Sequence, residues 1–138
     1  MTAEPGAKPA EPRWISEDTL LAIHAQQVER FGGLHGIRDG KVVEAALNRP
    51  RNVWGYSESA DLAEIAAMYL AGFAGSQGFN DGNKRTGVAC ALVFLVTNGL
   101  SVDSFSPGGL IEITMKVATG QANPEDVARF FRTELGAK

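Results

Sequence analysis

The chain has 138 residues, the length of one domain and enough to bury a hydrophobic core without disulfides or bound metals. Its 44% apolar and 21% charged residues exclude a wholly disordered chain, and a net charge of −3 argues against direct binding of nucleic acid. The single cysteine excludes a disulfide framework and a multi-thiolate zinc site. The longest apolar run, Gly87 to Val96, is far shorter than the about 20 residues of a membrane span. With no charged-then-apolar leader at the start, we expect a cytoplasmic protein without membrane contact.

The first 13 residues hold three of the six prolines and few apolar side chains. This composition predicts a flexible tail or an added segment that takes no part in the core. No internal repeat or second zone of composition follows. Residues 14–136 are therefore expected to form a single domain.

Six helices are predicted in that domain. The first begins after Ser16, a good N-cap, and ends at Gly32. Asp39 can cap a short second helix over about residues 40–48. Because proline lacks an N–H and its ring collides with the preceding turn, we expect Pro50 to end this helix.

Residues 50–59 show no helical period. Val53, Trp54 and Tyr56 in this stretch favour extended backbone. A loop or a small hairpin is therefore predicted here.

The remaining four helices set the fold class. Residues 60–75 and about 83–98 are apolar nearly all round, which indicates two buried helices. Helices over about 108–119 and 124–135 are amphipathic, and no alternation of strand length appears. We therefore predict an all-α fold in which amphipathic helices surround two central apolar ones.

The loop between the two apolar helices, GSQGFNDGNKRTG over residues 75–87, concentrates polar side chains beside the core. Lys84 and Arg85 lie in the first turn of the following helix, where cations oppose the helix dipole and a bound anion would reverse that effect. Gly82 lets the backbone approach a ligand, and Asp81 offers a hard oxygen ligand for Mg²⁺. The pattern indicates a cradle for a nucleotide polyphosphate and Mg²⁺. Spacing alone leaves open an ordinary helix start with solvated charges.

The string FNDGNKR, residues 79–85, resembles the signature H-x-F-x-[DE]-[AG]-N-[KG]-R of the Fic/Doc (Fido) superfamily. Residues 14–50 resemble the N-terminal half of the Doc, or death-on-curing, toxins, and the similarity extends over most of the chain. The resemblance implies a Fido domain over residues 14–136, with about six helices around a central buried helix and a short flap near 50–59.

The resemblance also implies a role for each motif residue. Phe79 would anchor the loop in the core, and Asp81 would bind Mg²⁺. The phosphates of ATP would be held by Gly82, Asn83, Lys84 and Arg85. The flap, on which a target segment is laid as an added strand, would consist of Arg51, Asn52, Val53, Trp54, Gly55 and Tyr56.

Lys84 and Val88 resemble the Doc type, because Fic adenylyltransferases usually have glycine and a second arginine at these positions. A Doc-type protein transfers the γ-phosphate of ATP to a Ser or Thr hydroxyl of a translation elongation factor. AMP transfer and a non-catalytic relative that binds nucleotide or antitoxin are the alternatives. The inhibitory motif [ST]-x-x-x-E-[GN] is absent, so an antitoxin chain is the expected restraint, docked on the apolar groove of the first helix.

Gln77 stands where the signature has histidine, the general base that accepts the hydroxyl proton. A primary amide does not titrate near neutral pH and cannot take this role. A general base contributes about 10²–10⁴-fold to the rate, so turnover should be impaired while binding of ATP and Mg²⁺ is retained. An engineered knock-out, a natural protein of weak or altered activity, and a binding-only relative all remain open.

The chain has two histidines. His24 lies on the apolar face of the first predicted helix, which favours a hydrogen-bonded core histidine over a metal ligand. His35 lies in a glycine-rich loop and is expected to be exposed. Cys90 is expected to pack as a small hydrophobe.

Overall fold

The computed structural model describes residues 8–136, which contain six helices and no strand. The helices are α1 (Glu17–Phe31), α2 (Gly40–Tyr56), α3 (Leu62–Ala74), α4 (Asn83–Thr97), α5 (Pro107–Ala118) and α6 (Pro124–Gly136). The all-α class is confirmed. Five of the helices lie within a few residues of the predicted limits.

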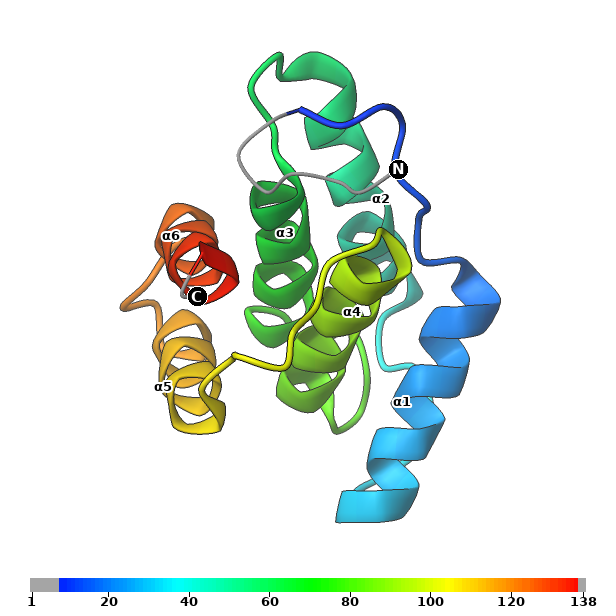
Figure 1. The fold of residues 1–138 in the computed structure, drawn as a ribbon. Coiled ribbons are helices and arrows are strands. Elements are labelled where there is room, and N and C mark those ends of the chain that lie inside the picture. Colours follow the sequence, from blue (N-terminus) through cyan, green and yellow to red (C-terminus); the bar gives the residue numbers. More distant parts are fainter. Residues whose placement is uncertain (1–7, 137–138) are drawn as a thin grey trace.

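Helices α3 and α4 lie side by side at the centre of the molecule (Figure 1). Helix α1 packs along α4, while α2, α5 and α6 pack against α3. This arrangement brings the α3–α4 loop next to the end of α1. Within the described residues, no helix has both the length and the apolar character needed to cross a membrane.

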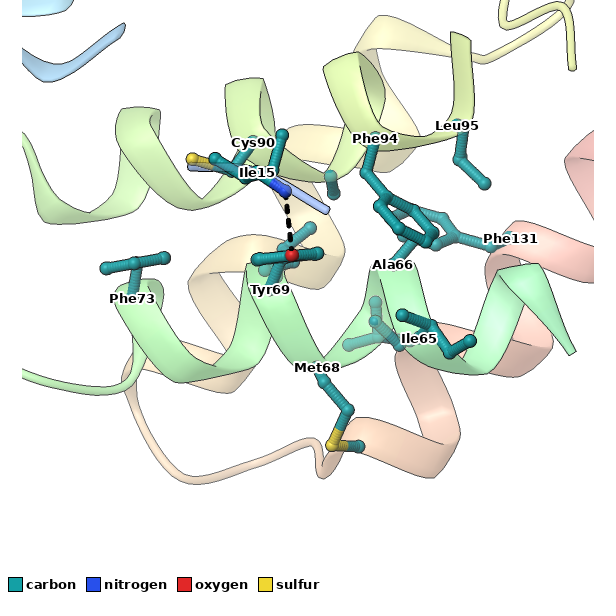
Figure 2. Packing of buried hydrophobic residues seen from close by; sticks show 14 of the residues in the cluster. Ile15, Ile65, Ala66, Met68, Tyr69, Phe73, Cys90, Phe94, Leu95 and Phe131 are labelled. Carbon is teal, nitrogen blue, oxygen red and sulfur yellow. Dashed lines mark hydrogen bonds between the residues drawn. The ribbon is translucent and has the colours of Figure 1, made fainter. Parts of the chain in front are cut away.

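The core lies between α3 and α4 and is closed by aromatic side chains (Figure 2). The fully buried Tyr69 accepts a hydrogen bond at its hydroxyl oxygen from the backbone N–H of Ile15, at 3.1 Å. Burial raises the pKa of Tyr69 to about 12, and burial raises the pKa of the Cys90 thiol to about 12. Both groups are therefore neutral, and Cys90 packs as a small hydrophobe, as expected.

Side-chain caps begin five of the six helices, and α4 is the exception. The capping residues are Ser16, Asp39, Asp61, Ser106 and Asn123. Helix α4 begins after Gly82, which has a φ of 80° and offers no side chain to its first turn. Among the described residues, α4 is thus the only helix whose free first-turn N–H groups donate no hydrogen bond to a side chain.

The prediction that Pro50 ends the second helix is wrong, and so is the predicted loop or hairpin over residues 50–59. Helix α2 continues through the buried Pro50 to Tyr56, and a loop follows. An interior proline costs about 3 kcal/mol. Burial of Val53, at about 1.5–3 kcal/mol, offsets much of this cost, and the partly buried Trp54 adds to it. Tertiary packing therefore outweighs the local preference.

Trp54 also packs edge-on against Trp14, with ring centroids 6.1 Å apart, and its Nε1 donates to the carbonyl of Pro9 at 3.3 Å. The backbone N–H of Arg13 donates to the Asn98 side chain at 2.8 Å. Residues 8–13 therefore contact the domain. The remainder of the segment expected to be a flexible tail, residues 1–7, lies outside the described residues.

Candidate functional site

The α3–α4 loop is held from within by Phe79 and Asn83. The Phe79 ring is fully buried and stacks on His24, with centroids 3.8 Å apart and an interplanar angle of 12°. The Asn83 side chain accepts from the N–H of Phe79 and donates to its carbonyl, both at 3.0 Å. The amide of Asn83 therefore closes the loop. Its backbone N–H has no partner among the described residues and remains available to a phosphate.

Helix α1 and the segment after it hold the motif from outside. His24 Nε2 lies 2.7 Å from the backbone oxygen of Asp81. The N–H of Leu34 donates to Asp81 Oδ2 at 2.7 Å. Arg85 Nη2 donates to the carbonyl of Gly32 at 3.0 Å. Asp81 and Arg85, two of the three charged residues of the motif, are thus oriented by contacts to residues far away in the sequence.

These contacts form a cleft of about 280 Å³ at the N-terminal end of α4. Its lining consists of Gly33, Asp81, Gly82, Asn83, Lys84 and Arg85. Within residues 8–136, the backbone N–H groups of Asn83, Lys84 and Arg85 have no hydrogen-bond partner, and the Lys84 ammonium has neither an ion pair nor a hydrogen bond. Free N–H groups, a helix dipole and two cations together attract an anion.

Asp81 is suited to a divalent cation shared with phosphate. Its Oδ2 is held by Leu34, while Oδ1 has no hydrogen-bond partner among the described residues. The described part of the chain contains no group of three or more His, Cys, Asp or Glu side chains that could hold a metal alone. A single carboxylate beside an anion site fits Mg²⁺, which is bound in proteins by one or two carboxylates together with substrate phosphates.

Gln77 is exposed and does not line the cleft. The two residues after it are buried, so the loop turns inward directly beyond this position. The amide lies at the surface, near the start of the motif.

The segment that pairs with the motif is residues 34–39, not the end of α2. Ile37 and Phe79 form an isolated antiparallel bridge. It is flanked by a hydrogen bond from the N–H of Arg38 to the carbonyl of Gly78, at 2.8 Å, and one from the N–H of Asn80 to the carbonyl of Gly36, at 3.1 Å. The predicted flap is instead helical, because Arg51, Asn52, Val53, Trp54, Gly55 and Tyr56 form the last turns of α2.

A second, apolar groove of about 510 Å³ adjoins the phosphate cleft. It lies between α1, α4 and α5, and Phe31, Ile111 and Met115 in its lining are 57%, 66% and 47% exposed. Lys84 and Arg85 line both hollows, so the groove is continuous with the cleft.

Sequence reasoning missed the contribution of α1 and of residues 32–38. His24 is indeed a buried, hydrogen-bonded histidine, but its partner is the motif, and His35 is exposed as expected. The paired glycines were the available signal. Gly33 has a φ of 116°, and a Cβ there would lie 2.9 Å from the Cβ of Asp81. Its lack of a side chain is what lets Asp81 approach.

The family comparison agrees with this geometry. The model of the Fic/DOC family matches residues 14–95, more than half of the chain, and the chain belongs to this family.

Two relatives are similar over most of this length. Protein kinase doc of Escherichia phage P1 is 38% identical over 125 residues, which cover 91% of this chain and 98% of that protein. Toxin Doc of Mycolicibacterium smegmatis is 33% identical over 100 residues, which cover 71% of this chain and 77% of that protein.

Proposed function

We propose that this chain has the scaffold of a Doc-type toxin, which transfers the γ-phosphate of ATP to a Ser or Thr hydroxyl of a target protein. The observation that carries the proposal is the uncapped, cationic start of α4 with a carboxylate beside it. Similarity to a protein named as a kinase supports phosphate as the transferred group. We place the activity in the cytoplasm, where ATP and elongation factors are found.

The motif residues would divide the work of phosphate transfer. The free N–H groups of α4, with Lys84 and Arg85, would hold the phosphates and spread their charge. Mg²⁺ on Asp81 would neutralise charge on the phosphate oxygens. The target hydroxyl oxygen forms a bond to the γ-phosphorus while the bond to the bridging oxygen of ADP breaks, and the hydroxyl proton passes to a base.

Gln77 cannot supply that base, so we propose that this chain binds ATP and Mg²⁺ but transfers phosphate slowly. Because phosphoryl transfer depends mainly on positioning and charge neutralisation, some activity is expected to remain. Val88 favours phosphate over AMP transfer, because it lines the apolar groove at the position where adenylyltransferases usually have a second arginine.

We propose that the target segment lies along residues 34–38. The bridge pattern directs the N–H and carbonyl of Ile37 away from Phe79, and neither has a partner within the described residues. Leu34 and Ile37 are 68% and 45% exposed, so an extended segment with an apolar side chain could add here as a strand. In the active variant described below, serine at both positions should lower target labelling and leave ATP binding unchanged.

We propose that an antitoxin covers the apolar groove between α1, α4 and α5. Arg30, Lys84 and Arg85 lie along this groove, which suits an amphipathic segment with acidic residues at one end. Such a segment would exclude nucleotide through the shared cations. Ile111→Asp should weaken antitoxin binding without changing the affinity for ATP.

The decisive experiment restores the base with Gln77→His. The parent chain should bind ATP and Mg²⁺ in calorimetry. The variant should label a target from γ-³²P-ATP about 10²–10⁴ times faster than the parent and arrest growth. Label from α-³²P-ATP would establish AMP transfer instead. Nucleotide binding with no label and no toxicity would identify a binding module.

A further inference from the structure

His24 is a buried polar group that the proposed transfer step does not use. It lies on α1 and is 4% exposed. Its Nε2 is 2.7 Å from the backbone oxygen of Asp81, and because a carbonyl only accepts, Nε2 must carry the proton. Its ring also stacks on Phe79. One side chain of α1 therefore contacts both the aromatic anchor of the loop and the peptide group beside the cleft.

The carbonyl bound by His24 belongs to the peptide bond between Asp81 and Gly82. In a planar trans peptide the C=O and the following N–H point in opposite directions. Holding the Asp81 oxygen toward α1 therefore directs the N–H of Gly82 away from α1. Gly82 lines the phosphate cleft, and its N–H has no partner among the described residues.

Without the His24 hydrogen bond, this peptide plane would be poorly restrained. Gly82 has a φ of 80°, and glycine readily adopts other conformations in which the preceding peptide has turned over. The Asp81 carboxylate is held separately, by the N–H of Leu34. Loss of the imidazole would therefore disturb the Gly82 N–H, which would donate to a bound anion, more than the Asp81 carboxylate, which would bind the metal.

We propose that His24 is a positioning residue that locks the Asp81–Gly82 peptide, so that the Gly82 N–H is directed at a bound phosphate. The inference rests on the proposed function, because it assumes that polyphosphate binds at the start of α4. It means that a residue of α1, outside the motif, contributes to the affinity for nucleotide.

Two substitutions in the full chain separate the hydrogen bond from the ring contact. His24→Gln keeps a donor at about the same reach but removes the ring. His24→Phe keeps a ring on Phe79 but removes the donor, and His24→Leu is a second apolar variant in case the phenylalanine distorts the loop. Calorimetry with ATP and Mg²⁺ gives the affinity. The amide resonance of Gly82, followed during addition of inorganic pyrophosphate, reports directly on the donor.

His24→Phe and His24→Leu should bind ATP about five- to tenfold more weakly than the parent, as expected for one lost hydrogen bond to a charged ligand. Their Gly82 resonance should lose its response to pyrophosphate. His24→Gln should keep most of the affinity and the response. Equal affinity in all four proteins, or an equal loss in all three variants, would overturn the inference, since only packing would then matter. A parent that binds no ATP overturns the proposed function first and this inference with it.

Discussion

The N-terminal ends of α3 and α4 solve the same electrostatic problem in different ways. At α3, the buried Asp61 carboxylate accepts from the N–H of Glu64 at 2.8 Å and from Arg132 at 2.7 and 3.2 Å. This hydrogen bond raises the pKa of the Arg132 guanidinium. The helix N–H groups, an anion and a cation are therefore all supplied by the chain.

At α4 the chain supplies the N–H groups and the cations but not the anion. Gly82 occupies the capping position, and Lys84 and Arg85 correspond in charge to Arg132. A phosphate bound there would complete the same arrangement. We infer that a helix start completed within the fold contributes to stability, while one that lacks only its anion is built to bind one. An anion at a helix N-terminus contributes about 0.3–1 kcal/mol, and up to about 2 where it is partly buried.

The largest effect on stability is expected at the start of α3. Asp61→Ala should lower the free energy of unfolding by about 2–3 kcal/mol, because it removes the cap of α3 and leaves Arg132 without its partner. Chemical denaturation measures this loss. Affinity for ATP should stay unchanged, since Asp61 does not line the cleft.

Asp103→Ala in an exposed loop is the matched control and should change stability by less than about 0.5 kcal/mol. A similarly small loss in Asp61→Ala would show that the α3 end is not a stabilising feature. The contrast between the two helix starts would then fail.

At the start of α4, substitution of the two glycines after α1 tests whether the position of Asp81 is needed for Mg²⁺-dependent ATP binding. Gly32 and Gly33 both have positive φ, 89° and 116°, so alanine at either position should cost about 1–2 kcal/mol. A Cβ at Gly32 meets nothing within 4 Å, whereas one at Gly33 would lie 2.9 Å from Asp81. Gly33→Ala should therefore also weaken Mg²⁺-dependent ATP binding, and Gly32→Ala should not.

Calorimetry with and without Mg²⁺ distinguishes these cases. If both variants bind ATP as the parent does, the position of Asp81 is not critical for the metal. An equal loss in both would point to general loosening of the segment after α1.

The helix starts also show how far sequence reasoning reaches. Asp39 and the cations of the motif were recognisable because capping and helix-dipole effects are local. The path of α2 through Pro50 was not, because its stability comes from burial of Val53 and Trp54 against distant residues. Tertiary packing decided the outcome there.

The candidate site divides in the same way. The motif indicated an anion cradle from adjacent residues alone. The bridge from Ile37 to Phe79 and the bond from His24 to Asp81 join residues more than 40 positions apart. No periodicity or spacing in the sequence indicates such pairs, and the sequence predicted a loop or hairpin over residues 50–59, where the structure has the end of α2.

The smallest effect, and the most specific, is expected from Lys84→Ala. Lys84 is the second residue of α4, and Lys41 is the second residue of α2, whose start is capped by Asp39. Without ligand, both alanine variants should be as stable as the parent or more stable by a few tenths of a kcal/mol, because each removes a cation that opposes a helix dipole. With ATP and Mg²⁺, Lys84→Ala should show a smaller rise in melting temperature and about fivefold weaker binding, a loss of about 1 kcal/mol.

Lys41→Ala should respond to ATP and Mg²⁺ as the parent does, because the anion at the start of α2, the Asp39 carboxylate, is already part of the chain. Equal nucleotide-induced shifts in the two variants would mean that the α4 cation is no more than a solvated surface charge.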